Sequence, residues 1–143
     1  MLEEREVDVQ KLISVLSQRK IDYCDGVAYI MPESCDEGVD LLNEYAPDIR
    51  KDFKERGIES VVVRGEQHNY FALRSADVIL PLIFGIPFAI FANFITDWIK
   101  ENLSGDKTVR VKYIKKDKGK YKEIIVEGTG NEVKDILDSL RDH

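Results

Sequence analysis

Histidine, the side chain best suited to proton transfer near neutral pH, occurs twice in this sequence. His68 lies in a polar stretch from Glu66 to Tyr70, where it could act as a general base or as a ligand. His143 stands at the end of the sequence. Because no second histidine lies near His68 to support a site, a solvated loop histidine is the favoured interpretation.

The two cysteines, Cys24 and Cys35, could act as a nucleophile or as metal ligands. Their spacing does not match a CxxC motif, and a tetrahedral zinc site would need two further ligands. The N-terminal residues are charged, whereas a signal peptide has an apolar core. The sequence therefore favours unpaired structural thiols, and we expect the protein in the cytoplasm or at the cytoplasmic membrane.

Three carboxylates, Asp48, Glu55 and Glu59, have the residue type with which metal-dependent hydrolases and nucleases hold Mg²⁺. Such enzymes also place an acid inside an adjoining strand, and residues 61–64 of the next expected strand contain none. The favoured interpretation is a solvated helix surface.

Residues 128–131 precede an expected helix and could bind an anion through their backbone amides. Thr129 and Glu132 also have the spacing of a capping box, in which each side chain accepts a hydrogen bond from the other residue's backbone N–H. The capping role explains the threonine without a ligand. The sequence therefore predicts no catalytic residue, no metal ligand and no cofactor.

Basic residues are concentrated in one region of an acidic chain whose net charge is -6. Between Lys107 and Lys122 there are eight bases and one acid. We favour a lysine-protected sheet edge, with contact to an anionic membrane surface as the alternative. The acidic first half argues against nucleic acid as a partner. The candidate basic patch comprises Arg110, Lys112, Lys115, Lys116, Lys118, Lys120 and Lys122.

Periodicity and turn residues predict an α+β fold. We expect an N-terminal β-α-β unit, a long apolar helix, and a C-terminal β-hairpin followed by a helix. The expected elements are a helix over 7–19, a strand over 27–31, a helix from Ser34 or Asp36 to Tyr45, a helix over 48–56 opened by Pro47, a strand over 58–64, a hairpin over 107–127 that turns at residues 117–120, and a helix from Thr129. Residues 65–77 are ambiguous, with a short strand around Tyr70, Ala72 and Leu73, and with Ser75 or Asp77 as a helix cap.

The longest apolar segment covers residues 78–96, nineteen residues without a charge. This length is typical of a membrane-spanning helix. Pro81, Gly85 and Pro87 predict a kink or a short helical hairpin, and Asn93 and Asp97 are costly against lipid. Three interpretations stay open: a single membrane span, a buried core or oligomerisation helix, and an amphipathic helix that inserts reversibly.

The side chains expected to contact a membrane or a partner are the large apolar ones of this segment. They are Ile83, Phe84, Phe88, Phe91, Phe94, Ile95 and Trp98. The expected organisation is an acidic α/β unit over 1–74, the apolar helix or kinked helical hairpin over 75–103, and a ββα unit over 104–143.

In the second half, an apolar helix ends in Asp97-Trp98-Ile99-Lys100, and a hairpin with the strand centres Val109-Arg110-Val111 and Ile124-Ile125-Val126 follows. This order, over residues 75–140, resembles the effector-associated constant components of prokaryotic conflict (immune) systems. The present segment is more apolar than in that family and carries two prolines. The resemblance implies an accessory role in bacterial defence and supplies no catalytic residues.

These observations predict a non-enzymatic interaction or adaptor component that uses the apolar segment for membrane anchoring or self-association. Its expected partner is a second copy, another protein, or the membrane. One alternative is a membrane-disrupting effector that oligomerises through residues 78–99. The other is a small metal-dependent hydrolase or nuclease.

Overall fold

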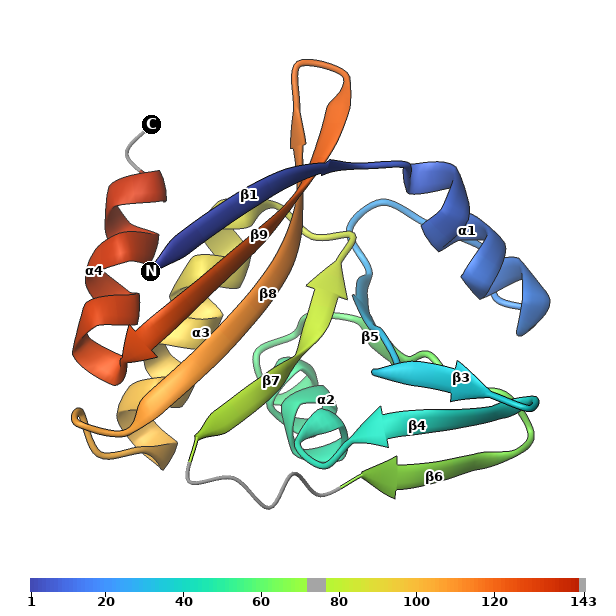
Figure 1. The fold of residues 1–143 in the computed structure, drawn as a ribbon, viewed down its shortest axis with the longest axis horizontal. Helices are drawn as coiled ribbons and strands as arrows, with labels where there is room; N and C mark the ends of the chain where they lie inside the picture. The colour runs from blue at the N-terminus through green and yellow to red at the C-terminus, as the bar shows by residue number, and fades with distance from the viewer. Residues whose placement is uncertain (72–76, 142–143) are drawn as a thin grey trace.

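The centre of the protein is a six-stranded mixed sheet with the order β1-β9-β8-β7-β2-β5 (Figure 1). The structure is a computed structural model, and it describes residues 1–71 and 77–141. The pairs β7–β8 and β2–β5 are parallel, and the remaining neighbours are antiparallel. The strands are β1 (Leu2–Val7), β2 (Ala28–Ile30), β5 (Ser60–Val62), β7 (Val78–Phe84), β8 (Thr108–Asp117) and β9 (Lys120–Thr129).

Helices cover both faces of this sheet, although unequally. The larger core lies between one face and three helices, α2 (Ala46–Glu55), α3 (Phe88–Asn102) and α4 (Gly130–Arg141). The smaller core lies on the other face beneath α1 (Val9–Gln18). A separate three-stranded sheet, β3 (Ser34–Asp36), β4 (Val39–Asn43) and β6 (His68–Phe71), lies beside the main one.

The predicted long apolar helix over residues 78–96 is wrong. The segment divides into strand β7, a turn at Gly85 to Pro87, and helix α3. Strand β7 lies inside the sheet and is buried on both faces, so its sequence is a continuous apolar run without alternation. Among the described residues, no helix is both long and apolar enough to cross a membrane.

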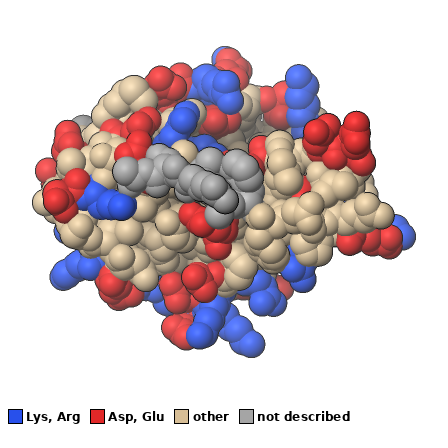
Figure 2. All heavy atoms as spheres, turned by 60° about the horizontal axis from the view of Figure 1, so that its bottom comes forward, with Lys and Arg blue, Asp and Glu red and all other residues tan. Residues whose placement is uncertain are grey.

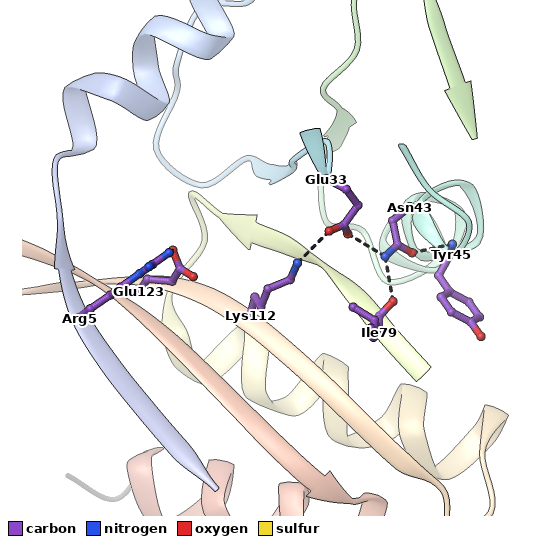
Figure 3. A network of polar contacts seen from close by, with 7 residues as sticks. All are labelled: Arg5, Glu33, Asn43, Tyr45, Ile79, Lys112 and Glu123. Atoms are coloured by element: carbon purple, nitrogen blue, oxygen red, sulfur yellow. Dashed lines mark hydrogen bonds and ion pairs between the residues drawn. The ribbon is translucent and has the colours of Figure 1, made fainter. Parts of the chain in front are cut away.

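Pro81 occupies the middle of β7, a position that proline normally avoids because it has no N–H for the ladder. The register between β7 and β8 shifts between Ile79 and Leu82, so the proline lies at an irregularity where regular pairing is already interrupted. The side chain of buried Asn43 lies at the same place (Figure 3). Its amide nitrogen donates to the Ile79 carbonyl at 2.8 Å, and its oxygen accepts from the Tyr45 N–H at 2.9 Å.

We predict that Asn43→Leu lowers the free energy of unfolding by about 2–3 kcal/mol, because the half-buried Ile79 carbonyl and the Tyr45 amide both lose a partner. Urea denaturation measures this change. The control is Asn69→Leu at an exposed position of β6, which should change the free energy by less than about 0.5 kcal/mol. Equal effects of the two substitutions would show that Asn43 does not support the irregular strand.

The predicted helix from Ser34 or Asp36 to Tyr45 is also wrong. This stretch forms the antiparallel pair β3–β4, and its two-residue turn places Glu37 at φ 51° and Gly38 at φ 78°. Two successive positive φ angles are typical of a tight hairpin turn. Strand β1 was not predicted, and Asp77 precedes a strand rather than a helix. Ala72, Leu73 and Ser75 lie outside the described residues.

Several other predictions are confirmed. Helices α1, α2 and α4, strands β2 and β5, and the β8–β9 hairpin all lie where the patterns place them, and β2 and β5 are parallel. The hairpin turns at Lys118 and Gly119, both with positive φ. The capping box forms, with Thr129 N–H donating to Glu132 at 3.0 Å and Glu132 N–H donating to the Thr129 hydroxyl at 3.2 Å. Strands from residues 1–74 and from residues 104–143 share the one main sheet.

Candidate ligand-binding pocket

The apolar side chains predicted to meet a membrane or a partner lie mainly in the protein core. Ile83 and Phe84 belong to β7, and the others belong to α3. Six of the seven are no more than 4% exposed: Ile83, Phe84, Phe91, Phe94, Ile95 and Trp98. Phe88, at the start of α3, is half-buried, and together with Phe84 it lines a surface cavity.

The candidate basic patch is distributed over both faces of the β8–β9 hairpin. Side chains alternate along a strand, so Lys112 and Lys116 lie on one face of β8 and Lys115 lies on the other. Lys112 pairs with Glu33 at 3.0 Å, and Lys120 lies 4.0 Å from Glu6. On the face shown in Figure 2, acidic and basic side chains are interspersed.

Three other basic residues of this set have different surroundings. Arg110 is half-buried, and its Nε has no hydrogen-bond partner among the described residues. Lys118 is exposed at the turn, and Lys122 is half-buried on β9. The basic residues therefore do not act as one surface.

The other candidate groups do not converge. His68 begins β6, with its Nδ1 3.0 Å from the Gly65 carbonyl oxygen, and His143 lies outside the described residues. Cys24 and Cys35 are unpaired, as predicted, and both are exposed. Within residues 1–71 and 77–141, no three His, Cys, Asp or Glu side chains come together in a way that could hold a metal ion, and this includes Asp48, Glu55 and Glu59.

A cavity of about 500 Å³ opens where β7 and β8 end. These strands are parallel neighbours joined through α3, so their carboxyl ends and the first turn of α3 meet at one edge of the sheet. Ligands of α/β proteins commonly bind at such an edge. The turn at Gly26, which precedes β2, closes the cavity from the other side, with its N–H donating to the Gly85 carbonyl at 2.9 Å.

Aromatic rings form the walls of this pocket from both faces of the sheet. Tyr23 stacks on Phe84, with centroids 5.5 Å apart and planes at 9°, on the α1 side. Phe88 lies 5.3 Å from Tyr113 on the α3 side. Tyr121 of β9 also lines the pocket. Flat apolar walls of this kind suit a ring-shaped ligand.

Two lysines contribute positive charge to the same pocket. Lys115 Nζ lies 5.5 Å from the centroid of Phe88, and Lys116 Nζ lies 5.9 Å from that of Tyr121. Neither ammonium group pairs with a carboxylate in the described part of the chain. Both charges are therefore available to an anion.

Helix α3 begins at the wall of the pocket without a cap. Its first intrahelical bond runs from the Phe91 N–H to the Pro87 carbonyl at 3.1 Å, so the amides of residues 88–90 have no acceptor within the helix. Pro87 provides no side-chain cap, and the first turn contains no acid. The positive end of the helix dipole therefore adds to the charge of the lysines.

Hydrogen bonds hold two of the tyrosine hydroxyls of the pocket, those of Tyr23 and Tyr113. The Tyr113 hydroxyl donates to the Ile86 carbonyl and fixes the turn that links β7 to α3. The Tyr23 hydroxyl donates to Asp25 at 2.5 Å. Burial is the main cause that raises the pKa of each phenol above its ordinary value, and Asp25 raises the pKa of Tyr23 further. Both phenols therefore stay neutral in ordinary buffers, and they can present flat faces without adding negative charge.

The sequence contained part of this site. Phe84, Phe88, Lys115 and Lys116 were candidates, although for a membrane, a partner or a basic surface. Tyr23, Asp25 and the two glycine turns were missed. The combination Gly-x-Pro after an apolar strand-length run is the signal that could have separated β7 from α3 and placed a turn between them.

No family model matches the chain, and comparisons with curated proteins and with solved structures find no match either.

Proposed function

We propose that this protein is a non-enzymatic binding component that takes a small anionic ligand with a flat ring into the pocket at the ends of β7 and β8. The observation that carries the proposal is the meeting of stacked aromatic walls with two lysines that pair with no carboxylate among the described residues. The ring of the ligand packs between the aromatic walls, and its anionic group lies near Lys115 and the first turn of α3.

This proposal retains the adaptor role predicted from the sequence, including its resemblance to accessory components of bacterial defence. Of the seven apolar side chains, Phe84 and Phe88 line the pocket, and the proposal moves the functional surface away from the other five. Those side chains stabilise the core, and their packing holds β7 and α3 in position at the pocket. A ligand in the pocket would contact the Gly85 turn and residues 113–116 of the β8–β9 hairpin, which line it.

A three-ligand calorimetric titration tests the proposal. Adenosine 5′-monophosphate provides a ring and an anion, adenosine provides the ring alone, and ribose 5-phosphate provides the anion alone. We expect the monophosphate to bind more tightly than either fragment, and Lys115→Ala to weaken it about tenfold, the loss of one charge-assisted contact.

The matched control is Lys100→Ala, which removes a lysine from the last turn of the same helix that opens the pocket. It should leave the affinity unchanged. If none of the three compounds binds at up to about 1 mM, or if Lys100→Ala weakens binding as much as Lys115→Ala does, the proposal is wrong.

A further inference from the structure

A second surface lies at the opposite edge of the main sheet, along β5. In the described part of the chain, β5 pairs with β2 alone and ends the sheet. The Ala28 N–H donates to the Glu59 carbonyl, and the Val63 N–H donates to the Ile30 carbonyl, both at 2.9 Å. Because backbone groups alternate in direction along a strand, the N–H and C=O groups of Ser60 and Val62 point away from β2.

A groove of about 340 Å³ follows this free edge. Pro47 and Arg50 of α2 form one side, and Arg64 and Tyr70 form the other. Tyr70 is 48% exposed, and its hydroxyl accepts a hydrogen bond from Arg64 at 3.2 Å. Ser60, Val61 and Val62 of β5 are half-buried, and they line the groove between these side chains.

The groove is positively charged in a protein with net charge -6. Among the residues that the structure describes, no Asp or Glu lines it. Arg50 has no hydrogen bond or ion pair among the described residues, and the only partner of Arg64 there is the hydroxyl of Tyr70. Guanidinium groups bind carboxylates through two parallel hydrogen bonds, which suits an acidic ligand.

We propose that the β5 edge is a docking site for an extended acidic segment of a partner protein. The segment adds as a further strand, with its main chain bonded to Ser60 and Val62 and its carboxylates bound to Arg50 and Arg64. The groove shares no lining residue with the β7–β8 pocket, so this inference is independent of the proposed ligand.

Fluorescence anisotropy with a labelled ten-residue peptide of alternating valine and glutamate tests the site. Saturable binding is expected, and a peptide of alternating valine and lysine should not bind. Arg50→Glu and Arg64→Glu should each weaken binding about tenfold or more. Lys54→Glu is the control, because this exposed residue lies on the same helix as Arg50 but does not line the groove.

Two further measurements test the strand-addition geometry. Val62→Pro removes an N–H that points away from β2, so it should keep the fold, as judged by circular dichroism, and abolish peptide binding. In the wild type, the amides of Ser60 and Val62 should exchange with deuterium more slowly when the peptide is bound.

Several results would overturn the inference: no saturable binding of the acidic peptide, equal affinity for the lysine peptide, or unchanged affinity in the Arg50→Glu/Arg64→Glu double variant. Sedimentation of the protein alone provides a last test. Self-association that Arg64→Glu abolishes, and with which the acidic peptide does not compete, would show that a second copy of the chain occupies this edge. The proposal of an acidic partner segment would then be wrong.

Discussion

Replacing Gly85 with alanine should lower the free energy of unfolding by at least about 3 kcal/mol, a large part of the roughly 5–15 kcal/mol that stabilises a typical domain. A Cβ at this position would lie 2.1 Å from the Val27 carbonyl oxygen and 2.9 Å from Cδ2 of Tyr29. The backbone at Gly85 also has φ +107°, a conformation that residues with a side chain rarely adopt. Backbone strain and the overlap of the new Cβ with its neighbours therefore both destabilise the variant. Urea denaturation should show a much lower midpoint concentration for the variant than for the wild type.

Gly119→Ala is the matched control for this prediction. Gly119 has φ +81°, but a Cβ there would have nothing within 4 Å. This substitution should lower the free energy of unfolding by about 1 kcal/mol, from backbone strain alone. If the two substitutions destabilise equally, the close approach of the Val27 carbonyl is not what requires the glycine.

Arg19→Met should cost about 3–5 kcal/mol, because it leaves the buried carboxylate of Asp40 without its counter-ion. The pair joins the C-terminal cap of α1 to β4: Nε of Arg19 donates to Asp40 Oδ2 at 2.7 Å, and Nη2 donates to Oδ1 at 2.5 Å. The side chains are 8% and 2% exposed. The Gly65 N–H also donates to Asp40, so the carboxylate connects three separate segments.

The same contacts make stability depend on pH. The hydrogen bond from Arg19, followed by that from Gly65, lowers the pKa of Asp40 from 3.8 to about 2 against the opposing effect of burial. The folded state therefore favours the ionised carboxylate, and its contribution is complete above the unfolded pKa near 4. It is lost as pH falls through about 2, a loss of about 2 kcal/mol. Denaturation of the wild type and of Asp40→Asn at pH 5, 3 and 2 should show this slope in the wild type only.

A double variant separates the charge from the packing. Arg19→Met/Asp40→Leu removes both charges, so it should recover a large part of the stability that Arg19→Met loses. If the double variant is no more stable than Arg19→Met, the cost arises from lost packing of the arginine stem and the unpaired carboxylate is not its cause.

The sequence predicts the local elements of this fold better than it predicts the central one. Periodicity places α1 and α4, and turn residues place the β8–β9 hairpin, because each has one polar and one apolar side. Strand β7 has no polar side, so its hydrophobic periodicity does not distinguish it from a helix, and only the Gly85 to Pro87 turn marks where it ends. Strand β1 is exposed along most of its length, and its pairing with β9 depends on contacts between residues more than a hundred positions apart.

The pocket is less predictable than the fold because its walls come from segments that are distant in sequence. Tyr23 precedes β2, Phe84 ends β7, and Lys115 lies on β8. The sequence shows which residue types are present. These residues come together only because β7 pairs in parallel with β8 and the chain turns at Gly85. A prediction that extends a helix through Gly85 removes that turn and therefore the site.

A titration of ¹⁵N-labelled protein with adenosine 5′-monophosphate, followed by amide chemical shifts, tests the central claim most directly. We expect saturable shifts concentrated at Gly26, Gly85, Phe88 and Lys115, around the ends of β7 and β8, with the amides of the β5 edge unchanged. Shifts confined to another part of the protein, or no shifts at saturating ligand, would contradict the assignment of this pocket as the binding site.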